Sequence, residues 1–343
     1  MTQPAEDLEG KVLDGGWVVE RKITRPLNGT GGSFSTGYIV SHPSGRKGFL
    51  KAMDYWKAFA AKDTAEELKK LTERYVFEKT ICIKCADARI TRVAIALDHG
   101  SHSGIHPLSK VEYLIFELAD GDVRTILDQD PTLDLVFKLR TLHATAAALK
   151  QLHGANMAHQ DVKPSNVLIF GADNESKLAD LGRAWHKDLP APHDGYQIPG
   201  DTTYAPYETF YGEPLSEPAR RFGYDMYLLG SMVVFLFARS SMRGMVDSRL
   251  HRHYHSSVSP ATYAEALPYL HTAFADAVLD FSASVPESVR DDLMTVVTEL
   301  CNPDWKRRGN PTASGQRQYG LARYVSVFDR LLRNAEHALS QGP

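Results

Sequence analysis

A run of polar residues near the middle of the chain carries several side chains that could act together on one substrate. The run reads His159-Gln160-Asp161-Val162-Lys163-Pro164-Ser165-Asn166, and Asp180-Leu181-Gly182 follows it. Phosphoryl transfer needs a carboxylate that orients the attacking hydroxyl and accepts its proton, and Asp161 could do this. It also needs hard cations on oxygen ligands, for which Asn166 and Asp180 are suited. Lys163 could offset the charge on the transferring group.

These two segments resemble the catalytic loop and the metal-binding loop of the eukaryotic-type protein kinases. The Asp-x-Lys-Pro-x-Asn run is highly specific for that family, and the resemblance extends over roughly residues 12–335. It implies an α+β, two-lobed fold. A lobe at 12–120, with a five-stranded antiparallel sheet and one helix, would bind the nucleotide. A mainly helical lobe at 121–335 would carry the catalytic loop, the activation segment and the substrate site. The implied cofactors are ATP and Mg²⁺, with Mn²⁺ as an alternative.

A lysine and a glutamate upstream would complete the catalytic set. Lys51 lies on a predicted strand and resembles the phosphate-binding lysine of the family, which pairs with an acid on the adjacent helix. We select Glu78 as that acid because the segment after it leads into the next predicted strand at the usual distance. The separation from Lys51 to Glu78 is longer than usual, which indicates an insertion within 55–67. The alternatives are an exposed helix charge at Glu78, or a role for one of the other glutamates of the helix, Glu66, Glu67 and Glu73.

Two further segments would contact the nucleotide. A glycine-rich stretch ahead of Lys51 could bring backbone amides close to phosphates, although a flexible hairpin would read the same. The segment 116–119 resembles the hinge whose backbone bonds adenine, and Asp122 would reach the ribose or cap a helix. The expected ATP contacts are Gly29, Gly31, Gly32, Ser33, Lys51, Glu117, Ala119 and Asp122.

The segment 200–208 resembles the end of an activation segment. Glu208 would pair with Arg307 or Arg308, and Asp225 would hold the backbone of the catalytic loop or simply cap a helix. Many protein kinases carry an arginine just before the catalytic aspartate, where it binds a phosphate on the activation segment. That position is Gln160 here, with Arg183 as a partial substitute. We therefore predict activity that does not depend on phosphate at Thr202, Thr203 or Tyr204 in this segment.

Secondary-structure signals agree with a sheet followed by helices. Strands are expected at 17–23, 37–40, 48–53, 93–97 and 111–118, with a helix at 64–82. Apolar residues at helical spacing predict a helix over 135–149 that Gly154 ends, and another over 321–332. The segment 226–237 is apolar on every side and should form a central core helix.

The composition of the chain limits the kinds of binding partner and the locations that we expect. The chain has 39 basic and 42 acidic residues, so we expect neither nucleic acid nor a membrane surface as a partner. The apolar segment 226–238 is too short to span a bilayer, and the first residues do not resemble a secretory signal. Three cysteines, an odd number, suggest a cytoplasmic location. The Cys82-x-x-Cys85 pair and the alternating His251, His253 and His255 are expected to be a helix face and a solvated loop, not metal sites.

The acceptor is expected to be serine or threonine on a protein, because Lys163 stands where Ser/Thr kinases carry theirs. Asp201 replaces the threonine that the family usually has after the glycine, which weakens this. Two other readings stay open: a small-molecule kinase of the same fold, and a pseudokinase that acts as a scaffold. The substrate is unidentified, and any regulatory input would come from a partner. Gln160 and the loose glycine stretch suggest a bacterial or viral source.

Overall fold

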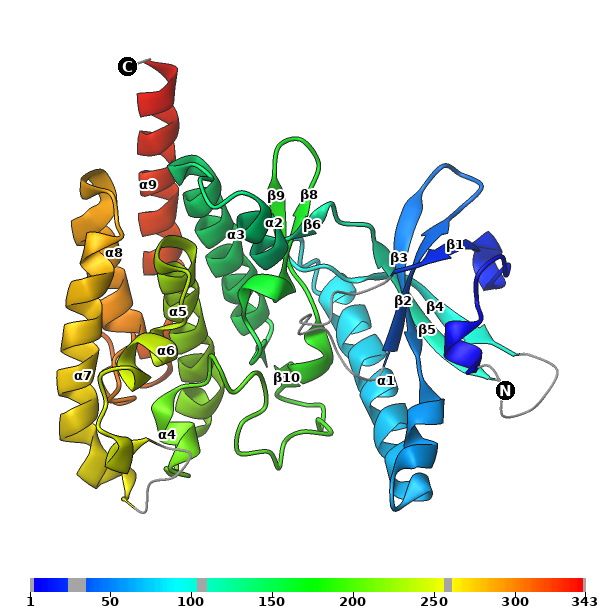
Figure 1. The fold of residues 1–343 in the computed structure, drawn as a ribbon, viewed down its shortest axis with the longest axis horizontal. Helices are drawn as coiled ribbons and strands as arrows, with labels where there is room; N and C mark the ends of the chain where they lie inside the picture. The colour runs from blue at the N-terminus through cyan, green and yellow to red at the C-terminus, as the bar shows by residue number, and fades with distance from the viewer. Residues whose placement is uncertain (1–2, 24–34, 104–109, 256–260, 342–343) are drawn as a thin grey trace.

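The computed structural model describes residues 3–23, 35–103, 110–255 and 261–341 (Figure 1). A five-stranded antiparallel sheet and a mainly helical region form its two lobes, which confirms the predicted α+β, bilobal class. The strands run in the order β1-β2-β3-β5-β4. Their bounds are β1 Val18–Lys22, β2 Ser35–Ser41, β3 Lys47–Met53, β4 Ala96–His102 and β5 Val111–Glu117.

Strand β3 lies at the centre of the sheet and carries Lys51. Its register pairs Lys51 with Gly37 on β2 and with Leu114 on β5. Because side chains alternate along a strand, the neighbouring Leu50 and Ala52 face the opposite side. That side is buried under the first residues of the chain, and the cluster contains Ala5, Leu8, Leu13, Trp17, Tyr38 and Leu50. Lys51 is therefore left on the face that looks toward helix α1 (Thr64–Asp87).

Strand β4 lies further along the chain than predicted. We expected it at 93–97, but it begins at Ala96, and Val93 makes only an isolated bridge to Leu178. Within the described residues β4 pairs with β5 alone and forms the edge of the sheet. Edge strands carry polar residues that discourage further pairing, and Asp98 and His102 belong to this strand. Most of the apolar segment 93–97, on which the prediction depended, therefore precedes the strand.

The helical lobe contains the remaining long elements (Figure 1). Its helices are α2 Val123–Gln129, α3 Leu135–Gly154, α4 Tyr207–Phe210, α5 Tyr224–Ala238, α6 Met242–Asp247, α7 Tyr263–Ala283, α8 Glu287–Leu300 and α9 Ala322–Ser340. Its strands form two small sheets, β6 (Gly121–Asp122) with β8 (Val167–Phe170) and β9 (Glu175–Leu178), and β7 (Met157–Ala158) with β10 (Trp185–His186). Short 3-10 helices lie at Pro4–Glu6, Asp14–Gly16, Tyr55–Ala60, Pro164–Asn166, Leu181–Arg183, Arg252–Tyr254 and Gly315–Tyr319.

Helix ends differ in detail from the predicted ones. Helix α1 begins at Thr64, with the Asp63 side chain accepting from the Glu66 amide at 3.0 Å as an N-cap. It runs past Cys82 to Asp87. Helix α3 ends at Gly154 as predicted, but the left-handed residue after it is Asn156, with φ of 56°. Asparagine tolerates that conformation better than most residues, so the glycine is not the residue that turns the chain.

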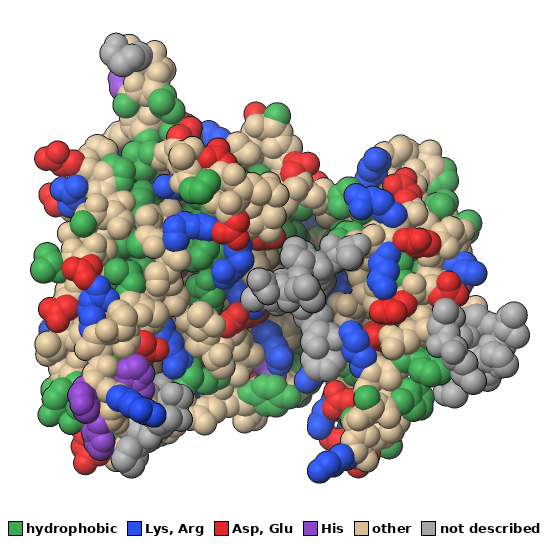
Figure 2. Space-filling model, viewed as in Figure 1, with side chains coloured by type: hydrophobic (Ala, Val, Ile, Leu, Met, Phe, Trp, Pro, Cys, Tyr) green, Lys and Arg blue, Asp and Glu red, His purple; other side chains and the backbone are tan. Residues whose placement is uncertain are grey.

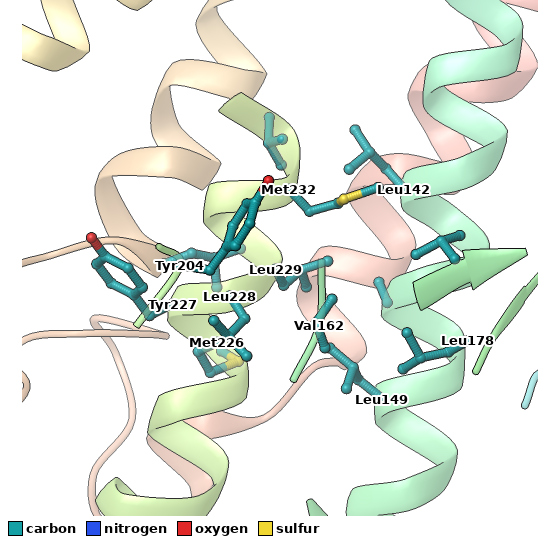
Figure 3. Close-up of a cluster of buried hydrophobic side chains, with 14 of the residues drawn as sticks. Leu142, Leu149, Val162, Leu178, Tyr204, Met226, Tyr227, Leu228, Leu229 and Met232 are labelled. Carbon is teal, nitrogen blue, oxygen red and sulfur yellow. The ribbon is translucent and has the colours of Figure 1, made fainter. Parts of the chain in front are cut away.

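Helix α5 forms the centre of the helical lobe. Figure 3 shows its Met226, Leu229 and Met232 among side chains from α3 and from the catalytic-loop region. With a preceding π-helical turn, Ala219–Gly223, the helical run reaches 20 residues, longer than the predicted apolar segment. By length and composition alone it could cross a membrane, but 89% of that window is buried inside the protein. Burial, and not shortness, is what identifies it as a core helix.

Charged side chains of both signs are interspersed on the molecular surface. Figure 2 shows lysine, arginine, aspartate and glutamate side chains mixed over both lobes on the face that it draws. The formal net charge is −3. On that face no single sign of charge dominates.

Candidate functional site

The Lys51 ammonium group joins the two lobes. Its Nζ donates to both carboxylate oxygens of Glu78 on α1, at 2.8 and 2.9 Å, and lies 3.3 Å from Oδ1 of Asp180. Glu78 is buried, at 5% exposure, whereas the Asp180 side chain is 40% exposed. The structure thus pairs Lys51 with the glutamate that we predicted. The region where we expected an insertion forms the 3-10 helix Tyr55–Ala60 and the first turn of α1.

Electrostatics favours a charged Lys51 and a charged Asp180. Burial alone would lower the pKa of Lys51, but the carboxylates of Asp180 and Glu78 outweigh it and raise that pKa. Lys51 holds the pKa of Asp180 at about 2. Burial raises the pKa of Glu78 against the opposing charge of Lys51. An ionised carboxylate beside a cationic amine is therefore fixed at the junction of the lobes, with one side open to solvent.

Asp161 is oriented by hydrogen bonds to both of its carboxylate oxygens. Oδ1 accepts from the Asp201 amide at 2.8 Å, and Oδ2 accepts from Asn166 Nδ2 at 3.0 Å. Lys163 Nζ lies 3.1 Å from the same Oδ2 and 3.4 Å from Asp201 Oδ2. Burial raises the pKa of Asp161 against the opposing charge of Lys163, and Asp180 adds to the rise. A raised pKa improves a carboxylate as a proton acceptor near neutral pH.

The backbone of the catalytic loop is held by Asp225 at the start of α5. Its Oδ2 accepts from the His159 amide at 2.8 Å, and its Oδ1 accepts from the Gln160 amide at 2.7 Å. Asp225 is fully buried, and His153 Nε2 lies 2.9 Å from its Oδ2. Gln160 itself has a left-handed φ of 62°. The two hydrogen bonds from backbone amides hold this uncommon conformation. The N-cap position of α5 is Gly223, so Asp225 holds the loop instead of capping the helix.

Of the residues predicted to contact the nucleotide, some lie outside the described part of the chain and others are bound to neighbouring protein groups. Gly29, Gly31, Gly32 and Ser33 lie outside the described residues. Glu117 ends β5, and its side chain binds Lys177 Nζ at 2.6 Å, while Ala119 lies in the link that follows. Asp122 caps α2, since its Oδ1 accepts from the Thr125 amide at 3.0 Å and its Oδ2 from the Thr125 hydroxyl at 2.7 Å. Of the two roles considered for Asp122, the helix cap is the one formed here.

The oxygen donors near Lys51 fit a hard cation. Asp180 contributes a carboxylate that stays ionised, as its pKa of about 2 requires. Both hydrogen bonds of the Asn166 side chain to Asp161 use its nitrogen, so the amide oxygen is the atom left for a cation. A Cβ at position 182 would lie 3.3 Å from Asp180 Oδ1 and 3.5 Å from Glu78 Oε2, so Gly182 lets the chain pass close to both carboxylates. Carboxylate and amide oxygens are the ligands that Mg²⁺ prefers.

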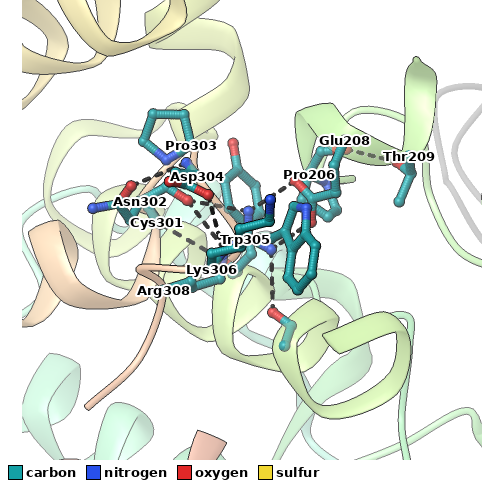
Figure 4. Close-up of polar contacts among 12 residues, drawn as sticks. Pro206, Glu208, Thr209, Cys301, Asn302, Pro303, Asp304, Trp305, Lys306 and Arg308 are labelled. Carbon is teal, nitrogen blue, oxygen red and sulfur yellow. Dashed lines mark hydrogen bonds and ion pairs between the residues drawn. The ribbon is translucent and has the colours of Figure 1, made fainter. Parts of the chain in front are cut away.

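The segment at 200–208 is anchored by a buried ion pair. Arg308 binds Glu208 through two parallel hydrogen bonds, Nη1 to Oε1 at 2.5 Å and Nη2 to Oε2 at 2.8 Å (Figure 4). The partner is Arg308, so of the two arginines considered Arg307 is not the one used. Tyr204 is buried, and its hydroxyl accepts from Arg124 Nη2 at 2.6 Å. A phosphate on Tyr204 would have to displace this contact.

One residue near the catalytic loop was missed by the sequence analysis. Arg221, from the π-helical turn before α5, donates from Nη1 to Gln160 Oε1 at 3.1 Å. Arg183, the cation that we expected to serve Gln160, instead lies over the Tyr196 ring at 5.7 Å. No spacing in the sequence connects positions 160 and 221, so no signal could have identified this contact.

The cysteine pair and the three alternating histidines, which we expected not to bind metal, lie in a helix and in a short histidine-rich segment. Cys82 and Cys85 are free, buried thiols on α1. His251 Nδ1 accepts from the His253 amide at 3.2 Å, and His255 Nε2 bonds the Leu250 carbonyl at 2.8 Å. Among the residues that the structure describes, no group of three His, Cys, Asp or Glu side chains is placed to hold a metal ion by itself.

Comparison with known proteins agrees with this geometry. The family described as a protein kinase domain matches residues 44–319. Mitogen-activated protein kinase 15 of Caenorhabditis elegans is 27% identical over 193 residues, 54% of this chain and 40% of that protein. Serine/threonine-protein kinase PknA of Mycobacterium tuberculosis is 30% identical over 154 residues, 42% of this chain and 34% of that protein. This chain thus spans well under half of the length of the curated relatives that it matches.

Proposed function

Because this chain belongs to the protein kinase domain family, we propose that it transfers the γ-phosphate of ATP to serine or threonine hydroxyls of proteins. The observation that carries the proposal is the position of the Lys51 ammonium, held 2.8 Å from Glu78 and 3.3 Å from Asp180. A buried structural ion pair needs one carboxylate. The contact to the half-exposed Asp180 is the longer one, so the Lys51 ammonium could exchange it for a nucleotide phosphate while Glu78 keeps the ammonium in place.

Each residue then has a part in the reaction. Lys51 binds and orients the nucleotide phosphates, while Glu78 keeps the ammonium in place. Asp161 orients the acceptor hydroxyl and takes its proton, and Lys163 offsets negative charge on the transferring group. Asp180 and Asn166 would hold Mg²⁺, or Mn²⁺ in its place, which when bound neutralises charge on the phosphates. Glu117, Ala119 and the glycine stretch would complete the nucleotide pocket.

Support for a serine or threonine acceptor comes from two sources. Lys163 stands two residues after Asp161, as in Ser/Thr kinases, and the Mycobacterium relative is named a serine/threonine-protein kinase. Phosphoamino-acid analysis of the labelled product tests this part. Phosphotyrosine as the main product would overturn it, and the carboxylate of Asp201 at the usual threonine position makes that measurement worth doing first.

The test of the proposal is a transfer assay with ATP labelled at the γ-phosphate and Mg²⁺. The expected result is label on the protein itself or on a generic protein acceptor, and its loss in the Asp161→Ala variant. Label on an aminoglycoside or choline instead would support the small-molecule kinase. Absence of label together with absence of ATP binding would support the pseudokinase scaffold. Chelation of the metal with EDTA should abolish transfer in the first two cases.

Several finer points complete the proposal. The nucleotide-binding lobe is taken as 12–120 and the catalytic lobe as 121–335. A cytoplasmic location is supported by the three cysteines, which are all free. The protein substrate and any regulatory partner are unidentified, with no nucleic acid or membrane partner expected. A bacterial or viral source remains a proposal from Gln160.

A further inference from the structure

The Arg221 guanidinium is buried between three elements. It is 4% exposed, and it donates from Nη1 to Gln160 Oε1 at 3.1 Å and from Nη2 to Asp194 Oδ1 at 2.9 Å. Its Nε donates to Glu217 Oε1 at 3.0 Å, and its Cζ lies 5.1 Å from the Trp185 ring centroid. One side chain thus connects the catalytic loop with the segment that runs from Asp180 to Glu208.

Asp194 closes a turn in that segment. Its Oδ2 accepts from the Ala191 amide at 2.8 Å, and its own amide donates to the Ala191 carbonyl at 3.0 Å. Its carbonyl accepts from Arg220 Nη2 at 2.5 Å. Two consecutive arginines therefore hold one aspartate, one by its carboxylate and the other by its backbone. Both the carboxylate and the carbonyl of Asp194 are thus bound to the π-helical turn that precedes α5.

The same turn reaches helix α1. His193, next to Asp194, is 2% exposed, and its ring meets the Phe77 ring edge-on at 5.5 Å and 88°. Phe77 is buried and directly precedes Glu78, the partner of Lys51. Displacement of the turn would remove the packing that keeps this part of α1 in place. Contacts thus run from Gln160 through Arg221 and Asp194 to the helix that carries Glu78.

We propose that Arg221 is a positioning residue and that the Asp194 carboxylate does in this protein what a phosphate on the activation segment does in kinases with an arginine before the catalytic aspartate. The inference rests on the proposed function, because it concerns the activation segment of a kinase. An arginine at position 160 would place a second guanidinium against Arg221. The neutral Gln160 oxygen accepts a hydrogen bond instead, and the anion that the cation needs is encoded at 194 as a permanent carboxylate.

The decisive variant is Asp194→Asn, which removes the charge at nearly constant size. A hydrogen bond between charged groups is worth a free energy that corresponds to roughly a tenfold to hundredfold change in an equilibrium. We expect amide hydrogen exchange in 187–199 and near Phe77 to rise by that factor, and the rate of phosphoryl transfer to fall. Asp194→Glu, which restores the charge, should recover part of both. Asp194 is 37% exposed, so these variants should fold.

Glu217→Gln is the matched control. Glu217 binds the same guanidinium from four residues earlier in the chain, and no hydrogen bond or ion pair joins its side chain to the described residues 180–208. We expect less than about a threefold change in exchange over 187–199, because exposed pairs contribute little. If Asp194→Asn and Glu217→Gln behave alike, Arg221 has only a structural part and the proposal fails.

Phosphatase treatment is the second part of this experiment. Wild-type protein freed of phosphate should keep the same exchange pattern and the same initial rate. The Thr202→Ala, Thr203→Ala double variant should match the untreated wild type in both. Loss of protection in the treated wild type, regained after autophosphorylation, would overturn the proposal. Hydrogen exchange needs no catalysis. A wild-type protein that transfers no phosphate would therefore refute the proposed function alone, while the exchange data still decide about Asp194.

Discussion

Replacement of Arg308 by methionine should destabilise the protein more than any comparable surface change. Arg308 is fully buried and Glu208 is 1% exposed, and the guanidinium also donates to the Asn302 carbonyl at 3.1 and 3.2 Å. Methionine fills a similar volume but leaves the Glu208 carboxylate buried without a cation. Removal of one partner from a buried ion pair costs about 3–5 kcal/mol, most of it from the unpaired charge.

That cost can be converted into a melting temperature. Unfolding entropy is about 2.1 cal/mol/K per residue near 60 °C, which gives about 0.7 kcal/mol/K for a chain of 343 residues. A loss of 3–5 kcal/mol should therefore lower Tm by about 4–7 °C if the protein unfolds as one unit. Differential scanning calorimetry measures this directly. The double variant Glu208→Leu, Arg308→Met removes both charges and should regain much of the loss.

An exposed pair with the same geometry is the control. Arg330 also binds Asp292 through two hydrogen bonds, at 3.2 and 2.8 Å, but the two side chains are 52% and 38% exposed. Exposed pairs contribute about 0–1 kcal/mol, so Arg330→Met should shift Tm by about 1 °C or less. Equal shifts in Arg308→Met and Arg330→Met would refute the reasoning, since burial would then make no difference to the cost.

Three further outcomes follow from the site. Asp161→Ala should lower the rate of transfer by about 10²–10⁴ while ATP still binds, as read from single-turnover rates and a nucleotide titration; wild-type turnover would contradict the assignment. Lys51→Met should abolish transfer and leave the Glu78 carboxylate unpaired, so denaturation should show a stability that rises as pH falls and Glu78 takes up a proton. Burial lowers the pKa of His193 to about 4. Its neutral ring should therefore contribute at most about 3 kcal/mol to the free energy of unfolding. This contribution is fully present above pH 6.5 and is lost as pH falls from there toward 4. His193→Asn should abolish that part of the slope, and an unchanged slope would show that other groups cause it.

The catalytic residues could be predicted because their spacing along the chain is short. Asp161, Lys163 and Asn166 lie in one loop, and their types match the chemistry whatever surrounds them. Glu78 lies further along the chain, and it was chosen because the next predicted strand follows it at the distance usual in the protein kinase family. The structure places Glu78 within 2.8 Å of Lys51. Resemblance to that family, more than local pattern, is the basis of these predictions.

Contacts between distant segments could not be predicted. Gln160, Asp194 and Arg221 come from three stretches, and Arg221 looks like an ordinary surface cation until the π-helical turn buries it. Similarly, the edge position of β4 explains why its polar residues gave no strand pattern. Both failures concern side chains whose environment is set by tertiary packing, which a single sequence does not record.

Asp225 holds the catalytic loop through hydrogen bonds from backbone amides, and therefore not through the side chains of the loop. Every residue other than proline has an amide hydrogen, so the two bonds to Asp225 can form with many different side chains at position 160, although its left-handed φ disfavours β-branched ones. The side chain at 160 accepts a hydrogen bond from Arg221. A lineage could therefore exchange arginine for glutamine there, and move the balancing charge to another segment, without passing through an ancestor with a misplaced catalytic aspartate.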